Sequence, residues 1–131
     1  MHMLQILPIA AYLVAVIAIV GVAVRAKRTG GDWRWPALFA ILFGAFSIWT
    51  FASDGLLIFW TNHTANLAGN QVWFDLLSAV AISFFLIAPR ARAVQMPLMP
   101  WAIAVVATAS IALFPMLARL LWLESKRGAE G

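Results

Sequence analysis

The chain has 131 residues, of which 64% are hydrophobic and only 11% are charged, and its mean hydropathy is +0.92. Soluble domains are about half apolar and about a quarter charged, so nine Lys and Arg with five Asp and Glu cannot cover a soluble globule of this size. This composition excludes a water-soluble enzyme, a disordered tail and a nucleic-acid-binding domain. The chain has no cysteine, which also excludes thiol–disulfide enzymes and Cys-ligated metal centres.

Four apolar stretches are long enough to cross a membrane as helices. About 30 Å of hydrocarbon divided by about 1.5 Å of rise per residue requires about 20 apolar residues. We predict spans at 4–24, 36–60, 71–88 and 101–123. The runs are continuously apolar, whereas barrel strands alternate apolar and polar residues. The predicted fold class is an all-α, four-helix transmembrane bundle that forms a single domain over residues 1–131.

The first span, 4–24, carries no charge, and the three residues before it include no Lys or Arg. A secretory signal peptide carries its basic residues before the apolar run, whereas here the basic cluster follows it. We therefore expect an uncleaved helix whose N-terminus faces outside.

The charges of the connections predict the orientation. The connection between the first two spans holds Arg25, Lys27, Arg28 and Arg34, the connection before the fourth span holds Arg90 and Arg92, and residues 61–70 hold no Lys or Arg. By the positive-inside rule both basic connections face the cytoplasm, and both termini then lie outside. Lys126 and Arg127 in the tail disagree with this topology. The sequence pI of about 10.8 thus reflects orientation more than affinity for nucleic acid.

Tryptophans gather at the predicted ends of the spans, as is typical of membrane interfaces. Trp33, Trp35 and Trp101 fall at the predicted cytoplasmic ends. Trp60, Trp73 and Trp122 fall at the predicted outer ends.

Three charged residues lie inside predicted spans: Asp54, Asp75 and Arg119. An Asp or Arg at the centre of a span costs about 2.5–3.5 kcal/mol on insertion scales. Asp54 lies roughly 9 Å inside the outer end of its span, and the other two lie about four residues from outer ends. We therefore predict one outer layer in which Arg119 pairs with Asp75, Asp54 or both.

Small residues precede these charged residues at helical spacing, so they lie on the same face of each predicted helix. On the second span the stripe is Ala37, Ala40, Gly44 and Ser47, and on the fourth span it is Ala104, Thr108, Ala112 and Pro115. Small residues let helices approach closely in lipid, so the charges are predicted to face other helices. Pro115 also predicts a kink just inward of Arg119.

The predicted layer has three interpretations. It is a structural ion-pair layer, a site that responds to protons or a ligand, or a set of side chains that reach to the interface. His63 lies beside it in a polar connection, where His63, Asp54 and Asp75 are potential metal ligands or proton carriers. No paired ligand spacing supports a metal, so we predict no metal and no cofactor, and the polar connection is interpreted as a capped turn.

Aromatic side chains form a further candidate site on the second span. Phe39, Phe43 and Phe46 recur at helical spacing, and Trp49 is the one tryptophan in the middle of a span. Such a stripe either receives a pigment or quinone or contacts lipid and the protein core.

Residues 60–124 resemble a group of small, uncharacterised four-helix bacterial inner-membrane proteins. The resemblance is carried by Trp73-Phe74-Asp75-Leu76-Leu77, by Ala88-Pro89-Arg90-Ala91-Arg92 and by the arginine in the last span, and it covers about half of the chain. It implies a bacterial inner membrane and this architecture. It implies no reaction.

Two hypotheses for function follow. The favoured one is a non-enzymatic accessory or assembly component of a larger membrane complex, or a homodimer, whose partners include the lipid bilayer and no nucleic acid. The alternative is a small proton-coupled carrier or a lipid- or isoprenoid-binding protein that uses Asp54, Asp75, Arg119 and His63. The first span holds no acid, which weighs against the small dimeric exporters as a template for the carrier.

Overall fold

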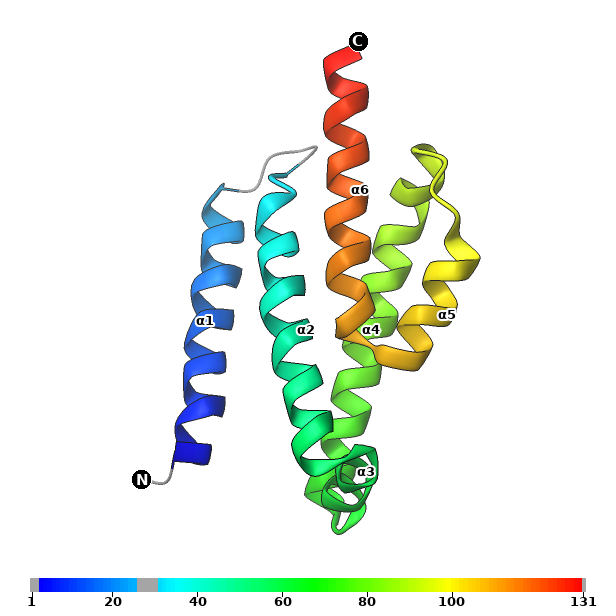
Figure 1. Ribbon diagram of the computed structural model, residues 1–131. Helices are drawn as coiled ribbons and strands as arrows, with labels where there is room; N and C mark the ends of the chain where they lie inside the picture. Colours follow the sequence, from blue (N-terminus) through cyan, green and yellow to red (C-terminus); the bar gives the residue numbers. More distant parts are fainter. Residues whose placement is uncertain (1–2, 26–30, 131) are drawn as a thin grey trace. The chain divides into compact units, whose positions relative to one another are not determined.

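The computed structural model describes residues 3–25 and 31–130, and every regular element in those ranges is a helix. In chain order the helices are α1 (Met3–Arg25), α2 (Arg34–Asp54), α3 (Leu56–Thr64), α4 (Leu67–Ala93), α5 (Leu98–Thr108) and α6 (Ser110–Glu130) (Figure 1). The all-helical prediction is confirmed. By length and composition, three of these helices, α1, α2 and α4, are able to cross a membrane.

The chain divides into two compact units, Met1–Gly31, which contains α1, and Asp32–Gly131, which contains the other five helices. The first unit is one helix of 23 residues, about 35 Å long. It matches the first predicted span to within about a residue at each end. The candidate sites all belong to the second unit.

The second predicted span is interrupted at Gly55. This glycine has a φ of 79° and a ψ of 165°, a conformation that side-chain-bearing residues rarely adopt, and it separates α2 from α3. The prediction of one helix over 36–60 is therefore wrong. Asp54 is the last residue of α2 rather than a residue well inside a span, because the 21 residues of α2 already measure about 31 Å.

A capped turn joins α3 to α4, as predicted for the polar connection. The side chain of Asn66 accepts a hydrogen bond of 2.8 Å from the backbone N–H of Gly69 and caps α4. A Cβ at Gly69 would lie 2.8 Å from the carbonyl oxygen of His63, so only glycine lets the two helices approach this closely. Figure 1 shows α3 end-on, so its axis runs across those of α2 and α4.

Helix α4 extends beyond the third predicted span. It begins at Leu67, runs through Pro89 and ends at Ala93 in a Schellman motif. The N–H of Met96 donates to the carbonyl of Ala91 at 2.9 Å, and Gln95 adopts a φ of 59°. The apolar run ends near residue 88, but the helix continues to Ala93, and the Arg90–Glu124 ion pair joins its last turn to α6.

The fourth predicted span is two helices that form a hairpin. Ala109 has a φ of 52°, which ends α5 and starts α6 in a different direction. Figure 1 shows that α5 (yellow) runs away from the end of α4 and α6 (orange to red) runs back toward it. The prediction of one crossing helix over 101–123 is wrong, because the chain reverses at Ala109. Helix α6 continues through Pro115, and the kink predicted there stays a prediction.

The core lies among α4, α5 and α6. Met116 and Leu120 of α6 are fully buried, and the connection after α4 contributes Met96. The cluster also contains Val80, Ile87, Ala91, Val105 and Ala112. These apolar contacts hold α5 against α6 and both helices against α4.

Helix α2 packs on α6 through aromatic side chains next to its small-residue stripe. Ser47 is buried, and Phe114 of α6 stacks on Phe39 at 5.6 Å between ring centroids and meets Phe43 edge-on at 6.3 Å. Ser47 of the stripe is buried, whereas a Cβ at Gly44 would meet open space, so the prediction that this face contacts another helix is confirmed in part.

The strained backbone at Ala109 gives a test of the hairpin. We expect Ala109→Gly to increase the free energy of unfolding by about 1 kcal/mol, because glycine adopts a positive φ without strain. The matched control Ala104→Gly, inside α5, should decrease it by about 0.5–1 kcal/mol. Thermal unfolding in detergent micelles measures both variants. An Ala109→Gly variant that is destabilised as much as the control would contradict the hairpin turn.

Candidate functional site

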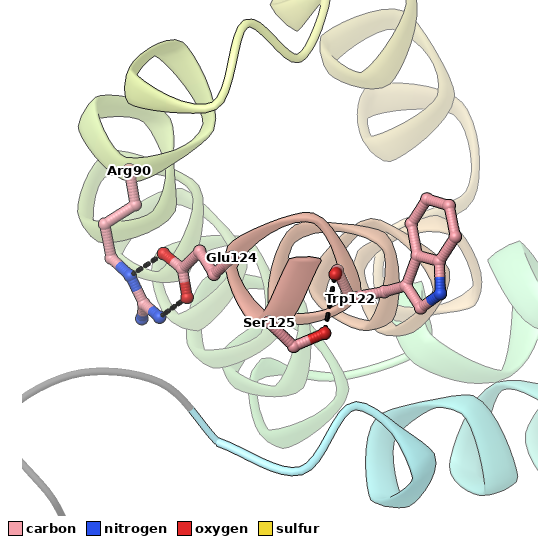
Figure 2. Close-up of polar contacts among 4 residues, drawn as sticks. All are labelled: Arg90, Trp122, Glu124 and Ser125. Carbon is pink, nitrogen blue, oxygen red and sulfur yellow. Dashed lines mark hydrogen bonds and ion pairs between the residues drawn. The ribbon is translucent and has the colours of Figure 1, made fainter. Parts of the chain in front are cut away.

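An ion pair joins the last turn of α4 to α6 (Figure 2). The guanidinium of Arg90 donates to both carboxylate oxygens of Glu124, with an Nε–Oε1 distance of 2.9 Å and an Nη2–Oε2 distance of 2.6 Å. The two side chains are 45% and 21% exposed. A two-pronged contact of this kind fixes orientation more strongly than a single surface ion pair.

A second contact joins the same two helices one turn further along. The guanidinium of Arg127 donates to the carbonyl of Ala93, the last residue of α4, and so satisfies one of the free carbonyls at that helix end. These contacts place the end of α6 beside the connection that follows α4. We call this region the basic end; it contains Arg34, Arg90, Arg92, Lys126 and Arg127.

Two cations flank one indole ring on α6. The Cζ atom of Arg119 lies 4.9 Å from the ring centroid of Trp122, and the Nζ atom of Lys126 lies 4.1 Å from it. The three residues share one face because they are spaced by three and four positions. Both cations are exposed, and each is attracted to the ring by a cation–π interaction. Figure 2 shows the Ser125 hydroxyl, which donates to the Trp122 carbonyl at 2.7 Å.

The same face of α6 borders an open groove of about 380 Å³ against α2. We call it the α2–α6 groove; its lining residues are Trp33, Ala37, Ala40, Ile41, Pro115, Ala118, Arg119 and Trp122. Trp33 and Trp122 thus lie at one end of the unit. The prediction that Trp122 marks the outer end, opposite Trp33, is wrong because the α5–α6 hairpin returns the chain to the basic end.

The structure does not bring Arg119 to the predicted acids. Arg119 lines the groove with Ala37, and Asp54 lies about 17 residues further along α2, or about 25 Å of helix. Within residues 3–25 and 31–130 the one ion pair is Arg90 with Glu124. The predicted pairing of Arg119 with Asp54 or Asp75 is therefore not formed.

The other predicted polar residues lie at the opposite end of the unit, around α3. Asp54 ends α2, and Asp75 lies in the early turns of α4; both carboxylates are exposed. In the described ranges no three His, Asp or Glu side chains gather closely enough to hold a metal ion.

His63 belongs to an aromatic cluster at this α3 end. Its Nδ1 lies 2.9 Å from the carbonyl oxygen of Phe59 and donates to it, and its ring stacks on Phe59 at 5.7 Å. The ring also meets Trp73 edge-on at 6.4 Å, and Trp73 packs on Trp60 at 6.0 Å. The indole N–H of Trp73 is buried without a hydrogen-bond partner. His63 therefore packs α3 against α4.

The aromatic stripe of α2 divides into two parts. Phe39 and Phe43 contact α6 through Phe114, as described above. Phe46 and Trp49 contact each other at 6.3 Å and remain 42% and 67% exposed. Only this second pair faces away from the protein, where it presents an apolar surface.

Sequence reasoning missed the residues that organise the basic end. The spacing of Arg119, Trp122 and Lys126 was visible in the sequence and is sufficient to place them on one helical face. The pairing of Arg90 with Glu124 was not visible, because it depends on the reversal of the chain at Ala109.

Comparison of the chain with protein-family models, with curated proteins and with solved structures finds no match. The resemblance to small four-helix bacterial inner-membrane proteins therefore stays a prediction.

The Arg90–Glu124 pair is tested by a double-mutant cycle. We expect Glu124→Gln and Arg90→Gln each to lower the free energy of unfolding by about 1 kcal/mol, with most of the loss shared in the double variant. The exposed Glu130→Gln control should change it by less than about 0.5 kcal/mol. Unfolding in detergent measures the cycle, and strictly additive losses would show that the two side chains do not interact.

Proposed function

We propose that the chain is a multi-pass protein of a bacterial inner membrane and a non-enzymatic component of a larger membrane assembly or a homodimer. The observation that carries this proposal is the turn between α5 and α6, in which Thr108 is exposed and Ala109 and Ser110 are half-buried. The proposal is developed from the depth of that turn and from the apolar surface beside it.

In the proposed topology α1, α2 and α4 cross the membrane, whereas α5 and α6 enter from the basic end and return to it. The 11 residues of α5 measure about 16 Å, about half the hydrocarbon thickness. All basic residues named at the basic end then face the cytoplasm, including Lys126 and Arg127, in agreement with the positive-inside rule. This topology replaces the expectation that the tail lies outside.

Such a hairpin places polar backbone near the middle of the bilayer. Backbone that is not helical is tolerated at this depth only where protein or water covers it. Thr108 at the turn is exposed, although its hydroxyl donates back to the carbonyl of Ala104 at 2.8 Å. A neighbouring protein that covers this turn satisfies the requirement.

The surface beside the turn is apolar. Met99, Ile103 and Val106 recur at helical spacing on α5 and are 71%, 65% and 88% exposed. The hairpin reaches only half the depth of the bilayer. Lipid or another protein therefore fills the remaining depth beyond the turn. A helix of a partner fits against this face and over the turn at the same time.

The carrier hypothesis has less support. It needs Asp54, Asp75, His63 and Arg119 in one layer, and the acids lie at the α3 end while Arg119 lines the groove at the basic end. Among the residues that the structure describes, neither Asp54 nor Asp75 forms an ion pair.

The topology is tested by single cysteines, which the Cys-free chain allows without further changes. We expect a membrane-impermeant maleimide to label Asn62→Cys in intact spheroplasts and to label Gly128→Cys only after lysis. Both positions are exposed. Labelling of both from outside would restore the four-span topology, and labelling of Gly128→Cys alone would invert the orientation.

The partner is tested by a photo-crosslinking amino acid placed on the α5 face. We expect crosslinks from Val106 to another protein or to a second copy in native membranes. The control position Phe74 on α4 is 70% exposed and lies near the α3 end. If Val106 forms only lipid adducts, as the control is expected to do, no protein covers the hairpin and the proposed role fails.

A further inference from the structure

We propose that the α2–α6 groove binds one anionic phospholipid of the leaflet at the basic end. In this proposal the lipid phosphate lies beside Trp122 within reach of Arg119 and Lys126, and an acyl chain lies along the apolar floor of the groove. This site rests on the membrane topology proposed above, but it does not depend on the proposed partner, which covers α5.

The two cations beside Trp122 favour an anionic ligand. Arg119 and Lys126 approach the same indole ring, at 4.9 Å and 4.1 Å from its centroid, so the two positive charges lie within about 9 Å of each other. In residues 3–25 and 31–130 the single ion pair is Arg90 with Glu124, so neither cation is paired with a carboxylate. A phosphate at the edge of the indole ring, within reach of both side chains, offsets their positive charge and accepts charge-assisted hydrogen bonds from them.

The tryptophans that border the groove indicate its depth in the membrane. Trp33 and Trp122 both border the groove, and tryptophan indoles concentrate at the level of lipid headgroups. Arg119 and Lys126 flank Trp122 and therefore lie at the level of the phosphates. Basic pockets between helices on the cytoplasmic side are a recurrent mode of anionic headgroup recognition.

The apolar lining of the groove favours a lipid over a small anion. Ala37, Ala40 and Ala118 are small, and Ile41 and Pro115 complete an apolar floor below the cations. A free phosphate or other small anion would leave this floor uncovered. An acyl chain covers it, so a lipid uses the cations and the floor together.

A second copy of the chain fits this groove less well. Two-fold symmetry brings the same patch of each copy close to its equivalent, which would oppose Arg119 and Lys126 to further cations. The charge at the rim therefore favours an anionic lipid as the occupant.

The test is native mass spectrometry of the purified full chain in detergent. It is titrated with dioleoyl phosphatidylglycerol and, separately, with dioleoyl phosphatidylcholine, which has the same acyl chains and no net charge. We expect the first bound phosphatidylglycerol to be held at least about fivefold more tightly, since each cation near a lipid surface contributes about a fivefold gain. Equal affinity for the two lipids would overturn the proposal.

Variants locate the site. Arg119→Gln and Lys126→Gln should each weaken phosphatidylglycerol binding by about fivefold. The control Arg92→Gln removes an exposed charge at the same end but away from the groove and should leave binding unchanged. Equal losses in Arg119→Gln and Arg92→Gln would show attraction by net charge alone and would overturn the site.

A second pair of variants keeps every charge. Ala40→Phe fills the groove and should abolish the tightly bound lipid, whereas Ala45→Phe, at an exposed position of α2 outside the groove, should not. Circular dichroism in the same detergent checks that each variant keeps its helices, and Lys126→Gln, at an exposed site, provides the readout if Arg119→Gln or Ala40→Phe unfolds.

Two other occupants are recognised in the same experiment. Displacement of the bound lipid by millimolar glycerol 3-phosphate would assign the site to a free phosphate. A dimer mass that Ala40→Phe removes, without any bound phosphatidylglycerol in the wild type, would assign the groove to a second copy. Either result overturns the proposal, and neither depends on whether α5 has a protein partner.

Discussion

The reversal of the chain at Ala109 is the constraint on which the arrangement of charge in the second unit depends. A continuous helix from residue 98 onward would carry Arg119, Lys126 and Arg127 toward the α3 end. The positive φ at Ala109 sends them back to the end where α4 finishes. The strained turn is held by the buried contacts of α5 and α6 with α4, since a position with this backbone persists only where its surroundings determine it.

The hairpin also decides which residues meet across α2 and α6. Because α6 returns toward the basic end, its residues from Phe114 to Trp122 lie against the first half of α2. Small side chains on both helices let them approach, and Phe114 fills part of the space between them. The groove remains where Ala37 and Ala40 face Pro115 and Ala118, since none of these side chains is large enough to close it.

The sequence predicts the helices of this fold better than their breaks. Apolar length alone located α1, α2 and α4, because a membrane span depends on one property summed over many residues. The break after Asp54 had a local signal, since an Asp-Gly pair is typical of a turn. The break at Ala109 had none: the turn contains no glycine or proline, and apolar residues continue on both sides of it.

The candidate site was harder to predict than the helices, because its residues are placed by the two helix breaks. The depth assigned to Asp54 and Arg119 assumed unbroken spans, so both breaks displaced a charge from the predicted layer. Glu124 follows the last predicted span and has no local partner in the sequence pattern, whereas in the hairpin it binds Arg90, a residue 34 positions earlier in the chain. Long-range pairs of this kind follow from topology and not from local spacing. The cations around Trp122 are local, and their spacing was sufficient to predict a shared face.

The charged residues of the second unit, at the positions that the structure gives them, need less desolvation than the predicted buried layer would. An ion pair inside the hydrocarbon must offset the desolvation of both charges, and it often fails to do so. Here Asp54 lies at a helix end, and the Arg90–Glu124 pair lies at the basic end, partly exposed, where desolvation is small. Arg119 lies beside Trp33 and Trp122 at the same end. In the proposed topology these charges set the orientation and contact headgroups, and the fold needs no ion pair in the membrane interior.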